Sequence, residues 1–172
     1  MAHVSYADTS APHIRAVADQ IASTRANSNL LNVDKVLLHN PKLAAGWRAF
    51  FSAVRTECGL TDMLREIVTL RVATLNRADY EFAQHEPIAR KLGITEAQLA
   101  SLRDARPSGF SSQEQLVLEL CDAMTRHIQV PDELIGRLKA TFDDRTLVEL
   151  VVTISAYNCV SRTLEALKIE NE

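Results

Sequence analysis

Helix start and stop signals recur along the whole chain, and they constrain its fold more than any other feature. Pro12, Pro41 and Pro131 each stand at the start of an apolar-periodic stretch, where the missing proline N–H costs nothing. Gly93 stands where another such stretch stops. The sequence has no convincing run with the period-two alternation of a strand. The pattern predicts an all-α chain of about eight helices.

The two central helices have well-marked ends. Thr61 and Asp62 are good N-terminal residues for a helix that runs to about Leu75, and Asp79 is a candidate cap for the next helix, which ends at Gly93. The later helices carry the same kinds of signal, namely two capping-box spacings and an acidic cap before a last helix that reaches about Lys168: Thr95 with Gln98, Ser112 with Gln115, and Asp143 or Asp144.

Length and composition are those of an ordinary globular protein. The chain has 172 residues, of which 47% are hydrophobic and 24% charged, so it can bury a substantial core. We expect one domain over residues 1–172, with residues 1–30 as an N-terminal extension whose role the sequence leaves open. The net charge of −3 gives no basic surface, so neither nucleic acid nor an anionic membrane is an expected partner.

Targeting signals and cysteine spacing both point to the cytoplasm. The N-terminus lacks the basic and apolar regions of a secretory signal, and no apolar run reaches the length of a membrane span. Cys58, Cys121 and Cys159 are odd in number and lack a Cys-x-x-Cys spacing. A disulfide framework, a structural zinc site and a dithiol redox centre are therefore not expected.

Glu66 and Arg71 lie in the otherwise apolar stretch "EIVTLRVATL". The surrounding residues predict a helix that is buried on most sides. A carboxyl group there must be protonated or paired with a cation, and Arg65 and Arg71 are the nearest candidates. Both a catalytic site and a structural ion pair meet this requirement, and the sequence does not choose between them.

Glu81 and His85 are four residues apart, so they share one face of the following helix. A carboxylate beside an imidazole orients the ring and fixes its tautomer, as proton transfer requires. Tyr80 can add a hydroxyl at the edge of the same site. An exposed ion pair with no catalytic role is the alternative. The loose Glu-x-x-x-His pattern does not predict a metal site, and His39 is expected to be a helix-end histidine.

The stretch "LREIVTLRVATLNRADYEFAQHEPIARKLGIT" closely resembles the core of the carboxymuconolactone decarboxylase family, which shares its fold with the alkylhydroperoxidase AhpD. "HNPKLAAGW" and "YNCVSRTLEAL" also resemble family features, so the resemblance spans about residues 33–167. It implies an AhpD-like helical domain that assembles into homo-oligomers, often trimers or hexamers.

In the peroxidase branch of this family the second helix carries Cys-x-x-Cys. Those positions are Ala78 and Glu81 here, so the resemblance does not imply thiol-dependent reduction of hydroperoxides. "ADYEFAQH" resembles the decarboxylase-type members instead. These use acid–base chemistry without a cofactor, because the lactone carbonyl of the substrate is the electron sink.

The resemblance implies a lyase or isomerase that acts on a small carboxylated unsaturated lactone or related ring compound. The expected catalytic residues are Glu66, Tyr80, Glu81 and His85, with His85 as the general acid/base oriented by Glu81. Arg71 and Arg162 are candidate anchors for a substrate carboxylate, with a structural ion pair as the alternative for each. Two other functions stay open: a cysteine-independent antioxidant role and a non-catalytic helical binding module.

Overall fold

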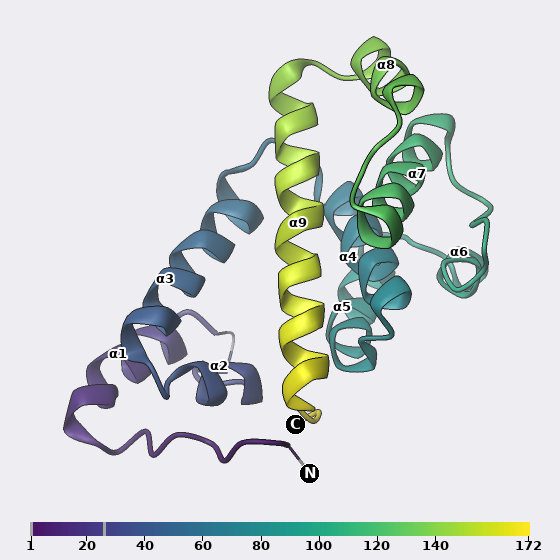
Figure 1. Cartoon of the computed structure of the whole chain (residues 1–172). Coiled ribbons are helices and arrows are strands. Elements are labelled where there is room, and N and C mark those ends of the chain that lie inside the picture. Colours follow the sequence, from purple (N-terminus) through teal and green to yellow (C-terminus); the bar gives the residue numbers. More distant parts are fainter. Residues whose placement is uncertain (1, 26) are drawn as a thin grey trace. The chain divides into compact units, whose positions relative to one another are not determined.

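A computed structural model describes residues 2–25 and 27–172, and over these residues the chain is helical with no strand. The all-α prediction is confirmed, with nine α-helices and one π-helical turn in the described ranges where about eight helices were predicted. The elements, shown in Figure 1, are α1 (Pro12–Ala22), α2 (Asn32–Leu37), α3 (Pro41–Ser52), the π-helical turn η1 (Ala53–Glu57), α4 (Asp62–Asn76), α5 (Asp79–Lys91), α6 (Glu96–Ser101), α7 (Ser112–His127), α8 (Asp132–Thr141) and α9 (Asp144–Leu167).

Contacts divide the described chain into two compact units. The first comprises the residues up to Glu57 together with Ala166–Glu172. Its core joins Ile14, Ala18 and Ile21 of α1 to other buried apolar side chains of this unit: Ala7, Leu37, Leu38 and Ala44. The described part of the N-terminal extension therefore supplies core residues. The C-terminal segment belongs to this unit too, because Glu172 Oε1 accepts a hydrogen bond from the Asn32 backbone N–H at 2.7 Å.

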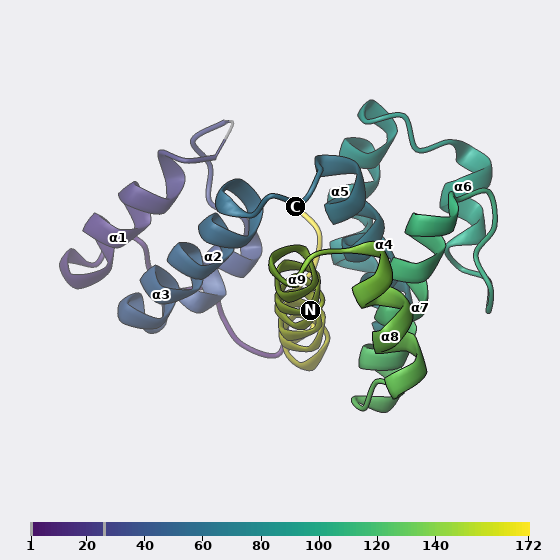
Figure 2. The ribbon, with the colours of Figure 1, turned by 90° about the horizontal axis from the view of Figure 1, so that it is seen from above.

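The second unit spans Cys58–Glu165 and contains all the predicted site residues. In it α4 packs between α5 and α7, and α8 lies against α7 (Figures 1 and 2). Its core is an apolar cluster contributed by α4 to α7 and the segments that join them: Ile67, Leu70, Ala73, Ala78, Phe82, Ala89, Ile94, Leu99, Leu102 and Leu118.

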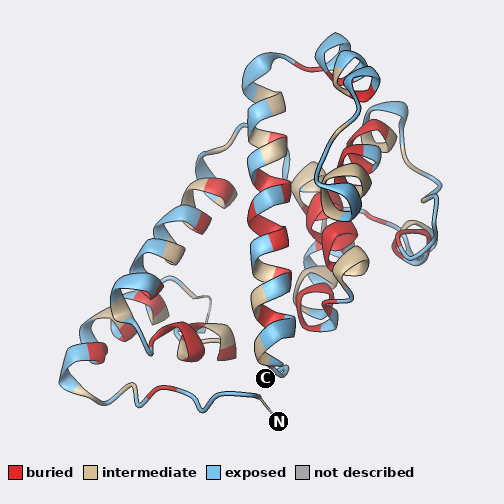
Figure 3. Cartoon of the chain, viewed as in Figure 1, coloured by how far each residue is buried: buried red, intermediate tan, exposed pale blue. Residues whose placement is uncertain are grey.

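Helix α4 is enclosed around its whole circumference. Every residue from Glu66 to Ala73 is buried, which is two full turns (Figure 3). The prediction of a helix buried on most sides is confirmed. Because no face of these turns meets water, the charged side chains of Glu66 and Arg71 must find their partners inside the protein.

Most of the predicted helix ends are confirmed, with shifts of one or two residues. Thr61 accepts a hydrogen bond from Leu64 N–H at 3.2 Å, and Thr95 with Gln98 forms a capping box. The second capping box is formed by Ser111 with Glu114, one residue before the predicted Ser112 with Gln115. Asp79 is the first residue of α5 rather than its cap. Of the two acidic candidates before α9, Asp143 is the cap, because it accepts a hydrogen bond from Thr146 N–H.

The outer face of α9 is uncharged over its middle turns. Its exposed residues there are Val148, Val152, Ser155 and Cys159. Their spacing of four, three and four residues puts them on one stripe of the helix. Such a face is suited to contact with another helix, but the predicted homo-oligomer stays a prediction. None of the helices in the described ranges is long and apolar enough to span a membrane.

Two helices of the second unit end in the same backbone motif with different residues. After α4, Ala78 N–H bonds to Ala73 C=O and Arg77 N–H to Thr74 C=O, with Arg77 left-handed at φ 58°. After α5, Ile94 N–H bonds to Ala89 C=O, and Gly93 takes the left-handed position at φ 97°. These are Schellman motifs, which favour glycine at that position because a Cβ is strained there.

The two motifs predict opposite effects of glycine exchange on stability. We expect Arg77→Gly to raise the free energy of unfolding by about 1 kcal/mol, because the exposed Arg77 gives up backbone strain. We expect Gly93→Ala to lower it by about the same amount, because an added Cβ meets no atom within 4 Å and only the backbone cost remains. Chemical denaturation at equilibrium measures both, and equal signs would contradict the assignment.

Candidate functional site

The centre of the candidate site is a hydrogen bond between a buried carboxylate and a histidine. His85 Nδ1 of α5 lies 2.7 Å from Glu66 Oε2 of α4. The Glu66 side chain is 4% exposed and that of His85 is 13% exposed. An ionised carboxylate can only accept, so it holds the proton on Nδ1 and leaves Nε2 for proton exchange. The side chain that pairs with Glu66 is thus a histidine from the next helix, not Arg65 or Arg71.

Helix α9 forms the opposite wall of this site. The ring of Tyr157 meets the His85 ring edge to face, with centroids 5.5 Å apart. One turn further on, the Ser161 hydroxyl donates to Glu81 Oε2. Because α9 runs antiparallel to α5, Glu81 and His85 on α5 face Ser161 and Tyr157 on α9.

The predicted orientation of His85 by Glu81 is therefore corrected. The carboxylate at Nδ1 belongs to Glu66, while Glu81 Oε2 accepts from Ser161. The spacing of four residues brings Glu81 and His85 to one face of α5, but the interhelical contact decides which carboxylate takes the ring nitrogen. Tyr80, also predicted for the site, is buried in the first turn of α5 at 7% exposure.

Ser161, Tyr157 and Asn158 were missed as site residues in the sequence. Asn158 joins three helices of this unit, since its Oδ1 accepts from Asn76 Nδ2 at 3.0 Å and its Nδ2 donates to Thr125 Oγ1 at 2.9 Å. A signal was present in "SAYNCVSR", where polar side chains recur at positions 157, 158 and 161 inside an apolar helix. Their partners are more than 30 residues away, so the sequence gives no means of pairing them.

Arg71 is fully buried and donates four hydrogen bonds. Its Nε and Nη2 donate to the two carboxylate oxygens of Asp122 at 2.6 Å each. Its Nη1 donates to the carbonyls of Leu102 and Asp104 at 2.7 and 2.8 Å. This is the structural ion pair that stood as the alternative to a substrate anchor. We therefore infer that Arg71 joins α4 to α7 and to the segment after α6.

Two other arginines of α4 and α5 are paired with carboxylates on or near their own helices. Arg65 Nη2 donates to Asp62 at 2.6 Å, and Arg90 Nη2 donates to Glu86 at 2.6 Å. Arg162, the second predicted anchor, is exposed on α9. It directly follows Ser161, so its side chain leaves the helix about 100° away from the one that contacts Glu81.

The types of residue at the site include possible metal ligands, but in the described ranges no group of three such side chains is placed to hold a metal ion.

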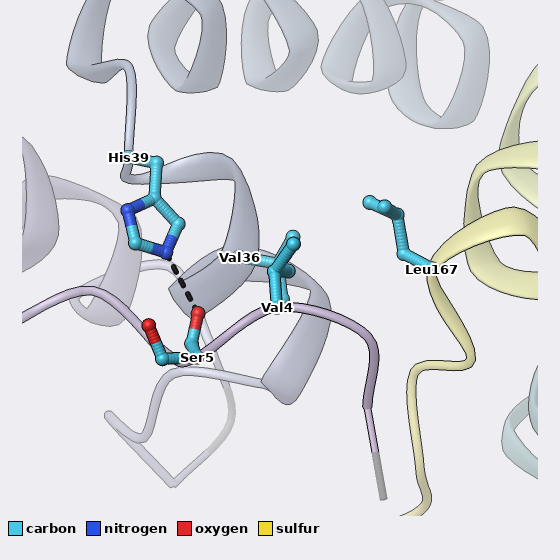
Figure 4. A pocket seen from close by; sticks show the side chains of 5 residues that line it. All are labelled: Val4, Ser5, Val36, His39 and Leu167. Carbon is cyan, nitrogen blue, oxygen red and sulfur yellow. Dashed lines mark hydrogen bonds between the residues drawn. The ribbon is translucent and has the colours of Figure 1, made fainter.

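A separate cavity of about 480 Å³ lies in the first unit, lined by Val4, Ser5, Val36, His39 and Leu167 (Figure 4). There His39 Nε2 donates to the Ser5 carbonyl at 2.7 Å, in agreement with its prediction as a helix-end histidine. None of the predicted catalytic residues lines this cavity.

The three cysteines, all in the described ranges, are not joined by disulfides and lie in different settings. Cys121 is buried in α7, and loss of solvation raises the pKa of its thiol far above the ordinary value. Cys159 is exposed on α9 and Cys58 is half-buried. The positions that correspond to the thiols of the peroxidase branch are both buried and hold Ala78 and Glu81.

Comparison with known proteins agrees with the resemblance seen in the sequence. Residues 41–123 match the profile of the carboxymuconolactone decarboxylase family. The uncharacterized protein YdfG of Bacillus subtilis (strain 168) is 33% identical over 101 residues, which cover 57% of this chain and 69% of YdfG.

Solved structures confirm the fold. An uncharacterized peroxidase-related protein from Ralstonia eutropha JMP134, described as an alkylhydroperoxidase AhpD core, superposes with a TM-score of 0.83 at 15% identity, covering 99% of this chain and 92% of that one. The debrominase Bmp8 in complex with 2,3,4-tribromopyrrole superposes with a TM-score of 0.78 at 15% identity, covering 99% and 90%. The AhpD-like fold predicted from the sequence is thus confirmed.

The pair of buried Arg71 and half-buried Asp122 predicts a large loss of stability when its carboxylate is removed. We expect Asp122→Ala to lower the free energy of unfolding by about 3 kcal/mol, because it leaves a buried guanidinium without a counter-charge. Glu119→Ala is the matched control on the same helix, because Glu119 pairs with Arg137 at the surface. Denaturant titration should resolve the first loss and not the second. Equally small losses would reopen the role of Arg71 as an anchor.

Proposed function

Because the chain belongs to the carboxymuconolactone decarboxylase family, we propose that it is a cofactor-independent lyase or isomerase whose Glu66–His85 pair moves protons on a small unsaturated ring compound. The observation that supports this proposal most directly is the 2.7 Å contact between His85 Nδ1 and Glu66 Oε2 in a largely buried setting. The debrominase Bmp8 binds an unsaturated ring compound on the same fold, which supports the class of ligand.

His85 is the general acid/base in this proposal. Glu66 accepts a hydrogen bond from the Nδ1–H of His85, so neutral His85 presents the lone pair of Nε2 to the substrate. When Nε2 takes a proton, the ring becomes an imidazolium whose charge the adjacent Glu66 carboxylate stabilises. Glu66 itself need not change its protonation state, and the proton returns to the substrate from Nε2.

The reaction proceeds through a dienolate. The lactone loses either carbon dioxide from its carboxyl group or a proton from the ring carbon next to the carbonyl. In both cases the electron pair moves through the ring to the carbonyl oxygen of the lactone. Both routes give an aromatic oxyfuran-like anion, which His85 then protonates at carbon. The substrate carbonyl takes up the electrons, so the chemistry requires no electron-accepting cofactor.

Glu81 and Tyr80 have supporting roles in the proposal. Glu81 is 2% exposed and accepts from Ser161, and it lies four residues before His85 on the same face of α5. Tyr80 is the candidate donor to the developing enolate oxygen. Arg71 has no part in substrate binding here, because Asp122 and two carbonyls occupy its guanidinium.

Reduction of hydroperoxides is the second candidate function. The Ralstonia structure with the same fold is described as peroxidase-related, which keeps this candidate open. A thiol mechanism needs an accessible thiolate and a resolving partner. In this chain only Cys58 and Cys159 have access to solvent among the three cysteines, and neither stands at the Ala78 or Glu81 position. A non-catalytic binding module is the third reading.

The proton-transfer proposal predicts the effect of removing the imidazole. On a panel of unsaturated lactones with and without a carboxyl group, we expect His85→Gln to lower single-turnover rates by about 10²- to 10⁴-fold. Glu66→Gln should cause a loss of the same order, because the amide NH₂ can donate to Nδ1 and hold the wrong tautomer, and the amide cannot stabilise the imidazolium as a carboxylate does. Ultraviolet absorbance follows both reactions, and exchange of ring protons in D₂O detects the dienolate directly.

The control for this experiment is His127→Gln. His127 is exposed at the end of α7 in the same unit, so its replacement should leave the rate unchanged. A wild-type rate in His85→Gln would remove His85 from the mechanism. Failure of the wild-type protein to turn over any lactone would favour the binding module.

The peroxidase candidate makes a separate prediction. We expect the wild-type protein to consume cumene hydroperoxide no faster than a variant in which serine replaces Cys58, Cys121 and Cys159. A peroxide assay with excess dithiothreitol measures the difference. Consumption that disappears with the single change Cys159→Ser would instead favour thiol chemistry at the exposed cysteine of α9.

A further inference from the structure

Tyr157 backs the His85 ring from the interior of the second unit. The two rings meet edge to face, with centroids 5.5 Å apart and planes at 86°. Aromatic rings at such distances attract one another in this arrangement. Tyr157 is fully buried, whereas the His85 side chain is 13% exposed. A ligand can therefore reach the imidazole but not Tyr157.

The part of α9 that carries this ring is tied to three other helices. Asn158 accepts a hydrogen bond from Asn76 Nδ2 of α4 at 3.0 Å and donates one to Thr125 Oγ1 of α7 at 2.9 Å. One turn further on, the Ser161 hydroxyl donates to Glu81 of α5. These bonds fix the register of α9 against its neighbours, so its aromatic ring has a set place beside α5.

The hydrogen bond to Glu66 fixes the His85 ring only in part. It sets Nδ1 2.7 Å from Glu66 Oε2 and so decides which edge of the ring faces α4. It still allows the ring to tilt about the line through these two atoms, because imidazole torsions are broad and hydrogen bonds tolerate a range of directions. The perpendicular ring of Tyr157 restricts this tilt, since tilting gives up the edge-to-face contact in a closely packed interior.

We infer that Tyr157 is a positioning residue for His85. Its ring fixes the plane of the imidazole, and Glu66 fixes which nitrogen faces α4. The Nε2 lone pair lies in the ring plane, so the two contacts together set the direction in which it points. Proton transfer depends on that direction. The inference rests on the proposed acid–base function of His85 and adds a residue that acts through it.

Two substitutions separate the ring of Tyr157 from its hydroxyl. Tyr157→Phe keeps the ring, and Tyr157→Leu replaces it with an aliphatic side chain. The order parameter of the His85 Cε1–H bond, from ¹³C relaxation of the full chain without substrate, measures how firmly the imidazole is held. Its resonance is assigned by its loss in His85→Gln. We expect about 0.85 in the wild type and in Tyr157→Phe, and below about 0.6 in Tyr157→Leu, as for rigid and flexible groups.

Turnover gives the second measurement. On the lactone panel we expect Tyr157→Leu to lower the single-turnover rate at saturating substrate by about 10- to 100-fold, because slight misplacement of a reacting group costs this much. The substrate concentration at half-saturation should not change, since Tyr157 is buried behind the imidazole. Tyr157→Phe should retain the wild-type rate.

Phe142→Leu is the matched control. Phe142 is another buried aromatic residue of the second unit, at the end of α8. Loss of its ring should lower stability without loosening His85. Tyr157→Met takes the place of the leucine variant if that variant does not fold, because the flexible methionine side chain fills irregular space.

This inference and the proposed function fail in different ways. The positioning role of the ring would be overturned by an order parameter that stays at its wild-type value in Tyr157→Leu, or that falls equally in Tyr157→Phe or Phe142→Leu. A loosened imidazole with an unchanged rate would overturn it too. The proposed function fails instead if lactone turnover survives His85→Gln. The order parameter is measured without substrate, so it reports on Tyr157 in either case.

Discussion

The enclosure of α4 is the constraint on which the second unit depends. A carboxylate or a guanidinium on two fully buried helical turns needs partners, because no other interaction would offset the free-energy cost of removing it from water. Glu66 and Arg71 meet this requirement in opposite directions. The first reaches His85 on α5, and the second reaches Asp122 on α7. The two interhelical contacts thereby tie α4 to both of its neighbours.

The two pairs differ in the chemistry that they can carry out. Arg71 makes four hydrogen bonds, two to Asp122 and two to backbone carbonyls, so this pair holds structure. The Glu66–His85 pair uses Nδ1 of the ring and leaves Nε2 for proton exchange in the proposed mechanism. One helix thus carries a structural pair and a pair suited to proton transfer, separated by little more than one turn.

The fold allows different chemistries at the same backbone positions. Where the peroxidase branch of the family carries its two thiols, this chain has Ala78 and Glu81, both buried in the same helical hairpin. The Glu81 carboxyl group is held by Ser161 from α9, so the replacement has its own partner in the structure. Exchange of a thiol for a carboxyl group changes the chemistry available without any change to the helices, which is why fold alone does not decide function.

The sequence by itself determined the features of the fold that arise from interactions between residues close together in the chain. Capping residues, prolines and apolar periodicity act within a few positions, and they predicted the all-α class, the ends of α4 and α5 and the burial of Glu66. The motif from Leu64 to Thr95 identified the family and placed Glu66, Glu81 and His85 near one another. Only the tertiary structure decided which carboxylate bonds His85 and that Asp122 takes Arg71. It also brought Tyr157 and Ser161 to the site, because these contacts join residues 19 to 80 positions apart whose approach is set by helix packing.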